Sequence, residues 1–133
     1  LLIEISGDPG FRARVRNRAI MALSAYPVSQ TRKYLESMLM EPSLTGTPTG
    51  TLLRRQALRS LGKAFRGDVV VSIANLKDDV NPQIRIAVAH ALAETQSDRA
   101  IPILSAWLPN EKELGVREAV DRALASFYRR GRK

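Results

Sequence analysis

The stretch Ile84-Arg85-Ile86-Ala87-Val88-Ala89-His90-Ala91-Leu92 decides the fold, because its pattern occurs four times along the chain. Each copy has an apolar residue, an arginine, alanine or valine at the fifth position, a small residue at the eighth and leucine at the ninth. The copies are VRNRAIMAL, LRRQALRSL, IRIAVAHAL and VREAVDRAL, and they begin at residues 15, 53, 84 and 116. The recurring positions share one helical face, so the pattern predicts four equivalent helices that pack closely through their small residues.

A second apolar segment with helical spacing lies between consecutive copies of this motif. These segments are residues 31–40, 68–77 and 99–108. In the last of them, Trp107 occupies a position typical of a core residue. The chain therefore alternates helix, turn, helix and turn, which predicts a single all-α domain over residues 1–133. We expect repeat units at about 1–27, 28–66, 67–96 and 97–128, followed by a basic tail at 129–133.

Residues that accept backbone N–H groups at helix starts precede most of these segments. Ser29, Asp68 and Asp98 are the expected N-caps of the second segments. Before the third motif helix, Asn81-Pro82 combines a cap with a proline at the first helical position, and Asp8-Pro9 resembles it before the first motif helix.

Tandem two-helix units of about 30 residues resemble HEAT repeats. The resemblance rests on the turn and motif helix at Lys77-Asp78-Asp79-Val80-Asn81-Pro82-Gln83-Ile84-Arg85 and on the opening of the next unit at residues 97–104. It is closer still to the short bacterial repeats of phycobilisome-lyase-like proteins. The resemblance covers residues 12–127 and implies a right-handed α-solenoid of about 3.5 antiparallel two-helix repeats, with the motif helices lining the concave face.

Two features depart from a regular array. The first unit holds only the end of its outer helix, at residues 1–6, so we expect the chain to be the C-terminal piece of a longer protein. The apolar face left uncovered there could be capped by upstream sequence or by a second chain, and the oligomeric state stays open. Residues 41–51 form an insertion rich in turn-forming residues, which predicts a mobile loop that either contacts a partner or is simply tolerated.

Composition excludes several kinds of site. The chain has no cysteine and one histidine, which excludes disulfides, thiolate metal sites and most histidine-based sites. We find no metal-ligand cluster, phosphate-binding loop or cofactor motif, and no apolar run long enough to span a membrane. The net charge of +8 is unevenly distributed, with +7 in residues 1–67, −3 in 68–128 and +4 in 129–133. Such asymmetry favours acidic partners at the basic end.

The motif arginines have two interpretations. The residues are Arg16, Arg54, Arg85 and Arg117. They could bind anions, but the family resemblance implies a structural role in which each arginine reaches an acidic residue in the preceding turn. Asp78 or Asp79 would then serve Arg85, and Glu111 or Glu113 would serve Arg117, fixing the register between units. Arg16 and Arg54 have fewer acidic neighbours in sequence.

The third, seventh and eleventh motif positions form a solvent-facing line on each motif helix. In the second unit this line is Arg55, Arg59 and Lys63, so one helix is fully basic on the face that the fold would turn inward. The candidate binding residues are Arg18, Arg55, Arg59, Lys63, His90 and Arg122. This concave patch indicates an acidic partner, and the alternative interpretation is an ordinary solvated helix face.

His90 lies one helical turn before Glu94, but no nucleophile or further acid joins this pair, so no catalytic site is predicted. The sequence therefore favours a non-enzymatic scaffold that binds an acidic protein partner, with no cofactor or metal. One alternative is sequence-independent nucleic-acid binding by the basic N-terminal half and the C-terminal tail, although aromatic residues are few. A lyase-like activity follows only from the family analogy.

Overall fold

The computed structural model describes residues 2–25 and 28–131, and within these residues it contains helices and turns but no strand. The α-helices are α1 (Leu2–Gly7), α2 (Ala13–Leu23), α3 (Ser29–Leu39), α4 (Pro48–Phe65), α5 (Val70–Ala74), α6 (Pro82–Glu94), α7 (Ala100–Trp107) and α8 (Leu114–Gly131). Short 3-10 helices follow three of them: η1 (Pro42–Leu44), η2 (Arg66–Val69) and η3 (Leu108–Asn110).

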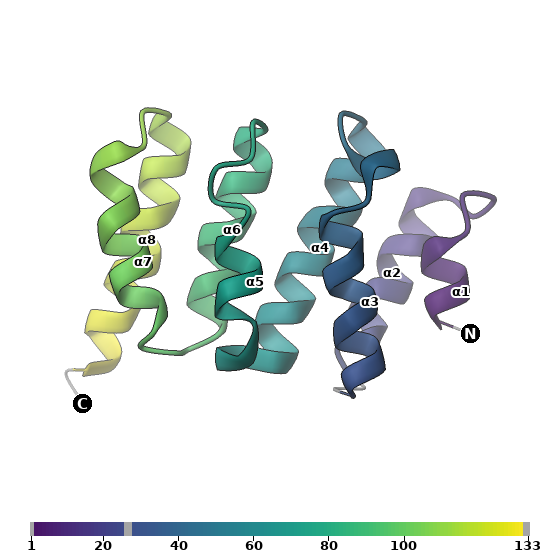
Figure 1. Cartoon of the computed structure of the whole chain (residues 1–133), viewed down its shortest axis with the longest axis horizontal. Helices are drawn as coiled ribbons and strands as arrows, with labels where there is room; N and C mark the ends of the chain where they lie inside the picture. Colours follow the sequence, from purple (N-terminus) through teal and green to yellow (C-terminus); the bar gives the residue numbers. More distant parts are fainter. Residues whose placement is uncertain (1, 26–27, 132–133) are drawn as a thin grey trace.

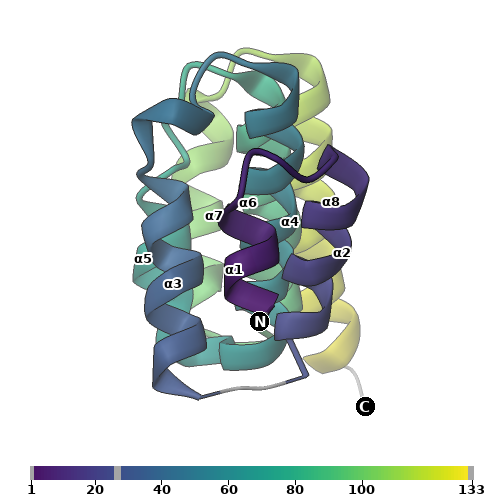
Figure 2. The same ribbon diagram turned by 90° about the vertical axis from the view of Figure 1, so that its right-hand side faces the viewer.

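The helices form two layers that run the length of the molecule (Figures 1 and 2). The motif helices α2, α4, α6 and α8 pack side by side in one layer. The other layer consists of α1, α3, α5 and α7, which lie in front of the motif helices in Figure 1. This arrangement confirms the all-α solenoid architecture that the repeated motif predicts.

The core lies between the two layers and along the motif helices. At the first motif position, Leu53, Ile84 and Val116 are fully buried. The outer helices contribute Leu35, Ile73 and Leu104, which are also fully buried. Trp107 is buried on α7, as its spacing predicts. Each motif helix therefore has one face in the core and one face exposed, as the helical spacing of the motif predicts.

The motif helices α4 and α6 approach each other closely at Gly62. A Cβ atom added there would lie 2.6 Å from the carbonyl oxygen of Ala91 on α6, closer than real Cβ atoms come to backbone. The absence of a side chain at this position sets the distance between the two helices, and this contact positions the exposed face of α4 beside that of α6.

The helix starts agree with the sequence only in part. Asn81 caps α6 as expected, with its Oδ1 accepting from the Gln83 N–H at 2.9 Å. The caps expected at Ser29, Asp68 and Asp98 are wrong. Ser29 is already the first residue of α3, Asp68 lies inside η2, and α7 begins after Arg99 without a side-chain cap.

Asp8 does not cap α2 either, because α2 begins four residues beyond Pro9. Its Oδ1 accepts from the Gly10 N–H at 2.8 Å, which closes a local turn. Arg12 occupies the N-cap position of α2 and makes no side-chain capping bond.

The insertion at 41–51 is more ordered than a mobile loop. Pro42–Leu44 forms η1, Leu44 is buried, and α4 already begins at Pro48. Thr47 caps α4 by accepting from the Gly50 N–H at 2.9 Å. Gly50 packs directly on the Leu44 backbone, which only glycine permits. The expectation failed because turn-forming residues also begin helices.

The basic tail expected at residues 129–133 lies only partly within the described residues. Residues 129–131 continue α8, and Arg129 is exposed on this last helical turn. Arg132 and Lys133 lie outside the described residues.

Candidate functional site

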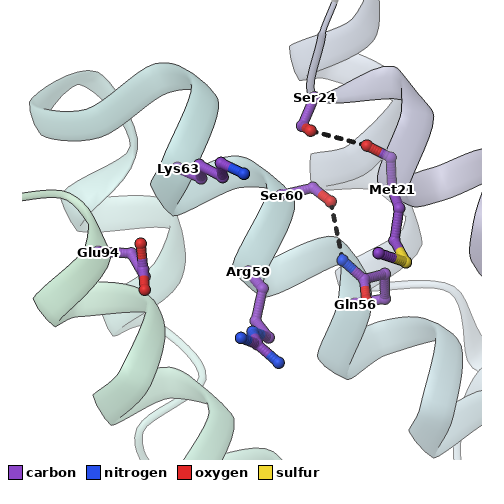
Figure 3. Close-up of a pocket in the computed structure, with 7 residues that line it drawn as sticks. All are labelled: Met21, Ser24, Gln56, Arg59, Ser60, Lys63 and Glu94. Carbon is purple, nitrogen blue, oxygen red and sulfur yellow. Dashed lines mark hydrogen bonds between the residues drawn. The ribbon is translucent and has the colours of Figure 1, made fainter.

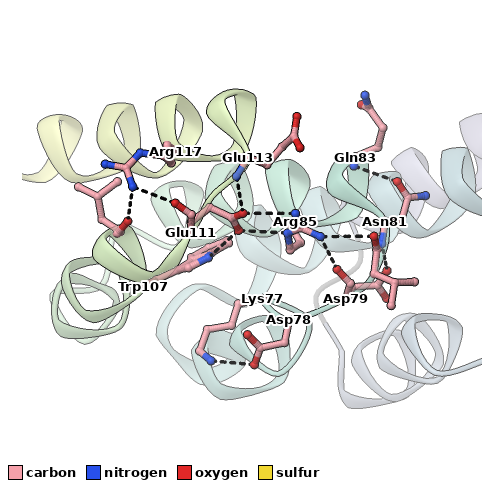
Figure 4. Close-up of polar contacts among 12 residues, drawn as sticks. Lys77, Asp78, Asp79, Asn81, Gln83, Arg85, Trp107, Glu111, Glu113 and Arg117 are labelled. Atoms are coloured by element: carbon pink, nitrogen blue, oxygen red, sulfur yellow. Dashed lines mark hydrogen bonds and ion pairs between the residues drawn. The ribbon is translucent and has the colours of Figure 1, made fainter.

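The motif arginines bind the turns of the repeat units, as Figure 4 shows for Arg85 and Arg117. Arg85 donates from Nε and Nη2 to the two carboxylate oxygens of Glu111, at 3.1 and 3.3 Å. Its remaining Nη1 donates to the Asp79 carbonyl at 2.8 Å. Arg117 repeats the second bond one unit later, from its Nη1 to the Glu111 carbonyl at 2.8 Å.

The same pattern joins the second and third units. Arg54 is buried, and its Nη2 donates to Asp79 Oδ2 at 2.8 Å. Asp79 and Glu111 thus accept hydrogen bonds in the same way. The side-chain carboxylate accepts from the motif arginine of the preceding unit, and the backbone carbonyl accepts from the motif arginine of the same unit. In the first unit, Arg16 donates to the Ser6 carbonyl at 2.9 Å.

These contacts correct one expectation about the arginines. The sequence paired Arg85 with an acidic side chain of the turn before it, but Arg85 reaches only backbone carbonyls there. Its carboxylate partner is Glu111, in the turn that follows. The observed pairing differs from the predicted one because the carboxylates of Asp79 and Glu111 contact the preceding motif helix. The spacing of residues along the chain does not reveal this. All four arginines form structural contacts in the described chain.

Glu111 is the most heavily used of the turn acids. Beside its contacts with Arg85, it accepts from the Trp107 indole N–H at 3.2 Å and from the Glu113 N–H at 3.1 Å. Burial acts to raise the pKa of Glu111, but these hydrogen bonds and the charge of Arg85 outweigh burial and lower the pKa below its ordinary value. Glu111 therefore stays ionised in the folded chain and holds α6, α7 and α8 together.

The exposed side of the motif-helix layer carries a cluster of basic side chains. We define the basic patch as Arg55, Arg59, Lys63, His90 and Arg122. All five are exposed, and they come from α4, α6 and α8. None of them forms an ion pair within residues 2–25 and 28–131. The charges of Arg55, Arg59, Lys63 and Arg122 therefore have no ion-pair partner among the described residues.

His90 reports the electrostatics at the centre of the basic patch. Partial burial lowers its pKa, and the positive charges of Arg59, Arg55 and Arg122 lower it further. Glu94 opposes this effect but does not cancel it. Three arginines from two neighbouring helices thus act on one imidazole, so α4, α6 and α8 bring these predicted binding residues together.

A pocket of about 270 Å³ lies beside the basic patch, between α2, α4 and α6 (Figure 3). Arg59 and Lys63 line it on α4, and Glu94 lines it on α6. The remaining lining residues are Met21, Ser24, Gln56 and Ser60. Sequence reasoning missed Gln56 and Ser60, which are joined by a hydrogen bond at 3.2 Å and add polar groups to the lining.

Arg18 stands apart from the other predicted binding residues. It lines a separate hollow on α2 with Arg12, Arg14 and Val15. The structure therefore does not bring Arg18 into the pocket lined by Arg59 and Lys63.

Comparison with protein families decides the class of this repeat. The model for HEAT repeats matches residues 50–125, which is more than half of the chain. The chain belongs to the HEAT-repeat family. This HEAT domain matches no curated protein in a sequence search.

HEAT repeats are generally protein-interaction scaffolds and are typically non-catalytic. In the described part of this HEAT domain, no three acidic or histidine side chains gather in a way that could hold a metal ion. None of its described helices is long and apolar enough to cross a bilayer.

Proposed function

We propose that this HEAT domain is a non-enzymatic scaffold that binds an acidic segment of another protein along the basic patch, on the concave face of the motif helices. The observation that carries the proposal is the set of exposed cations Arg55, Arg59 and Lys63 on α4 and Arg122 on α8, which have no ion-pair partner among the described residues. By contrast, the motif arginines Arg54 and Arg85 already form ion pairs with Asp79 and Glu111.

The patch is costly in the free protein, which supports a binding role. Arg55, Arg59 and Lys63 are successive i, i+4 neighbours on α4, and like charges at this spacing destabilise a helix by about 0.2–0.5 kcal/mol per pair. An acidic partner removes this repulsion. The positive field of the patch also attracts an acidic partner before contact and so raises the association rate.

The adjoining pocket favours a peptide over a uniform polyanion. Its walls combine two cations with the half-exposed Met21 side chain and the Gln56 and Ser60 polar groups. In a peptide, a carboxylate side chain could pair with Arg59 and Lys63 while a neighbouring apolar side chain packs on Met21. Glu94 also lines the pocket, and its carboxylate repels a nucleic-acid backbone, which carries a negative charge at every phosphate.

Reversing the basic patch should abolish binding without unfolding the chain. The variant is Arg55→Glu, Arg59→Glu and Lys63→Glu, and all three side chains are exposed and make no hydrogen bond in the described chain. We expect the affinity for a fluorescent glutamate-rich peptide to fall by about 100-fold or more, because each attraction becomes a repulsion. Fluorescence anisotropy measures the affinity, and circular dichroism checks the helices.

A matched control variant changes the net charge equally, with Lys33→Glu, Arg99→Glu and Lys112→Glu. These exposed residues lie on α3, just before α7 and in the turn before α8, away from the basic patch. Equal weakening by both variants would mean that only net charge matters. Unchanged binding by the patch variant would overturn the proposal, and tight, steeply salt-dependent binding of labelled DNA or RNA in place of the peptide would favour the nucleic-acid alternative.

A further inference from the structure

Arg16 lacks the carboxylate partner that its counterparts have in the next two units. Arg54 donates to the carboxylate of Asp79, and Arg85 donates to that of Glu111. Arg16 donates through Nε to a backbone carbonyl of α1 at 2.9 Å, and its two Nη groups make no hydrogen bond or ion pair among the described residues. The residue is only 9% exposed. A guanidinium this deeply buried is unfavourable without an anionic partner.

Glu41 occupies the position of the missing partner. It follows Arg16 at the same 25-residue separation that lies between Arg54 and Asp79. Like Asp79, it accepts the backbone N–H two residues ahead, at 3.3 Å. Glu41 is nevertheless exposed and forms no ion pair among the described residues. The arginine and the acid of this unit are therefore both present but not joined.

The course of the turn after Glu41 explains why this pair is open. The next motif helix begins three residues after Asp79, but seven residues after Glu41. The additional residues include η1, in which the backbone of Leu44 packs directly on Gly50 of α4. This packing gives the Glu41 turn a different path from the Asp79 turn and keeps the carboxylate away from Arg16.

A pocket of about 370 Å³ takes the place of the ion pair, and Arg16 and Glu41 both line it. The rest of its lining comes from α1, α3 and η1. The Arg16 Nη atoms are not among the fully buried atoms without partners, so they keep accessible surface where Arg16 lines the pocket. None of the lining residues belongs to the basic patch.

The opposite charges of the pocket select a ligand that carries both signs. An anion without a positive group would be repelled by Glu41, and a cation without a negative group would be repelled by Arg16. A ligand carboxylate can accept two parallel hydrogen bonds from a guanidinium, which is a strong and directional contact. A ligand ammonium group can donate to the Glu41 carboxylate.

The remaining walls add one polar acceptor and an apolar surface. Ser6 Oγ donates its hydrogen to the Ile3 carbonyl at 3.0 Å, so the Tyr34 hydroxyl donates to Ser6 Oγ at 2.6 Å. The Tyr34 oxygen, which lines the pocket with its residue, therefore keeps a lone pair for a donor. Met38 and Leu44 supply apolar lining.

We propose that this pocket binds a free α-amino acid with an apolar side chain. Its carboxylate pairs with the Nη groups of Arg16, its ammonium group donates to Glu41, and its side chain packs on Met38 and Leu44. The volume lies within the range of about 300–1,000 Å³ that is usual for small-molecule sites. The bound amino acid bridges an arginine and an acid that the later units join directly.

An NMR titration of the backbone amides with L-leucine tests this site. We expect L-leucine at about 10 mM to shift the signals of Gly7 and Ser43, which line the pocket. Isocaproate lacks only the ammonium group of leucine, and isoamylamine lacks only its carboxylate. Each should bind about tenfold more weakly or worse, because it loses one charge-assisted contact. Unshifted signals with L-leucine, or equal binding of either analogue, would overturn the proposal.

Glu41→Gln should weaken L-leucine binding about tenfold or more and leave urea unfolding unchanged, because Glu41 is exposed and unpaired in the described chain. Glu113→Gln, at another exposed turn glutamate, is the matched control and should change neither. Asp79→Asn should unfold at lower urea, since it removes the carboxylate that Arg54 contacts. A comparable loss of stability in Glu41→Gln would show that Glu41 pairs directly with Arg16, and would overturn the open site.

Discussion

Glu111→Ala should lower the free energy of unfolding by about 3 kcal/mol, which is a large share of the stability of a domain this size. The substitution leaves the half-buried Arg85 guanidinium without its carboxylate and the Trp107 indole N–H without an acceptor. A buried charge that loses its partner costs much more than the intact pair contributes. Urea unfolding followed by circular dichroism measures the change.

The neighbouring Glu113→Ala is the matched control, since the Glu113 side chain is exposed and accepts no hydrogen bond in the described chain. We expect a change within about 0.5 kcal/mol for this variant. In a double-mutant cycle, Arg85→Ala combined with Glu111→Ala should cost less than the two single changes added together. Additive costs would show that the two residues do not act as a pair across the units.

Gly62→Ala should destabilise the chain by about 1–3 kcal/mol, although alanine normally stabilises a helix interior relative to glycine by about 1 kcal/mol. The new Cβ would lie 2.6 Å from the Ala91 carbonyl oxygen, so α4 and α6 must separate. Separation of these helices loosens packing along the whole contact, because cores do not absorb extra volume without strain. Thermal or urea unfolding measures the loss.

Gly115→Ala, on the motif helix α8, is the matched control, and we expect no destabilisation from it. Its Cβ would meet only the Ile86 Cδ1 atom, at 3.7 Å, which is an ordinary contact. The variant should be neutral or stabilised by up to about 1 kcal/mol. Equal effects of the two alanines would contradict the close approach of α4 and α6 as the cause.

The motif helices were predictable because their period is repeated four times and the fifth and ninth positions are buried in every copy. Helix ends were less predictable, since a cap works at one position only and the N-cap positions of α3, α5 and α7 each lie one residue from the expected one. Gly50 illustrates the same limit. In the sequence it belongs to a run of turn residues, whereas in the structure its missing side chain lets α4 begin against Leu44.

The basic patch was largely predictable and the arginine pairing was not. Arg55 and Arg59 project from the same face as His90 because helical spacing and repeat alignment fix them together. The pairing of Arg85 with Glu111 joins residues 26 positions apart in different units, and several acids lie nearer in sequence. Choosing among them requires the positions of the turns, which depend on how one unit stacks on the next.

His90 is the only histidine of the chain, so its imidazole gives a single reporter at the centre of the basic patch. The most direct test of the proposed binding surface is an NMR pH titration of this imidazole with and without the glutamate-rich peptide. The free chain should show a pKa below 6.5, and bound carboxylates should raise that pKa by offsetting the charges of Arg59, Arg55 and Arg122. By linkage, the peptide should bind more tightly as the pH falls through this range. A His90 pKa that stays the same while the peptide binds would place the binding surface elsewhere and contradict the account.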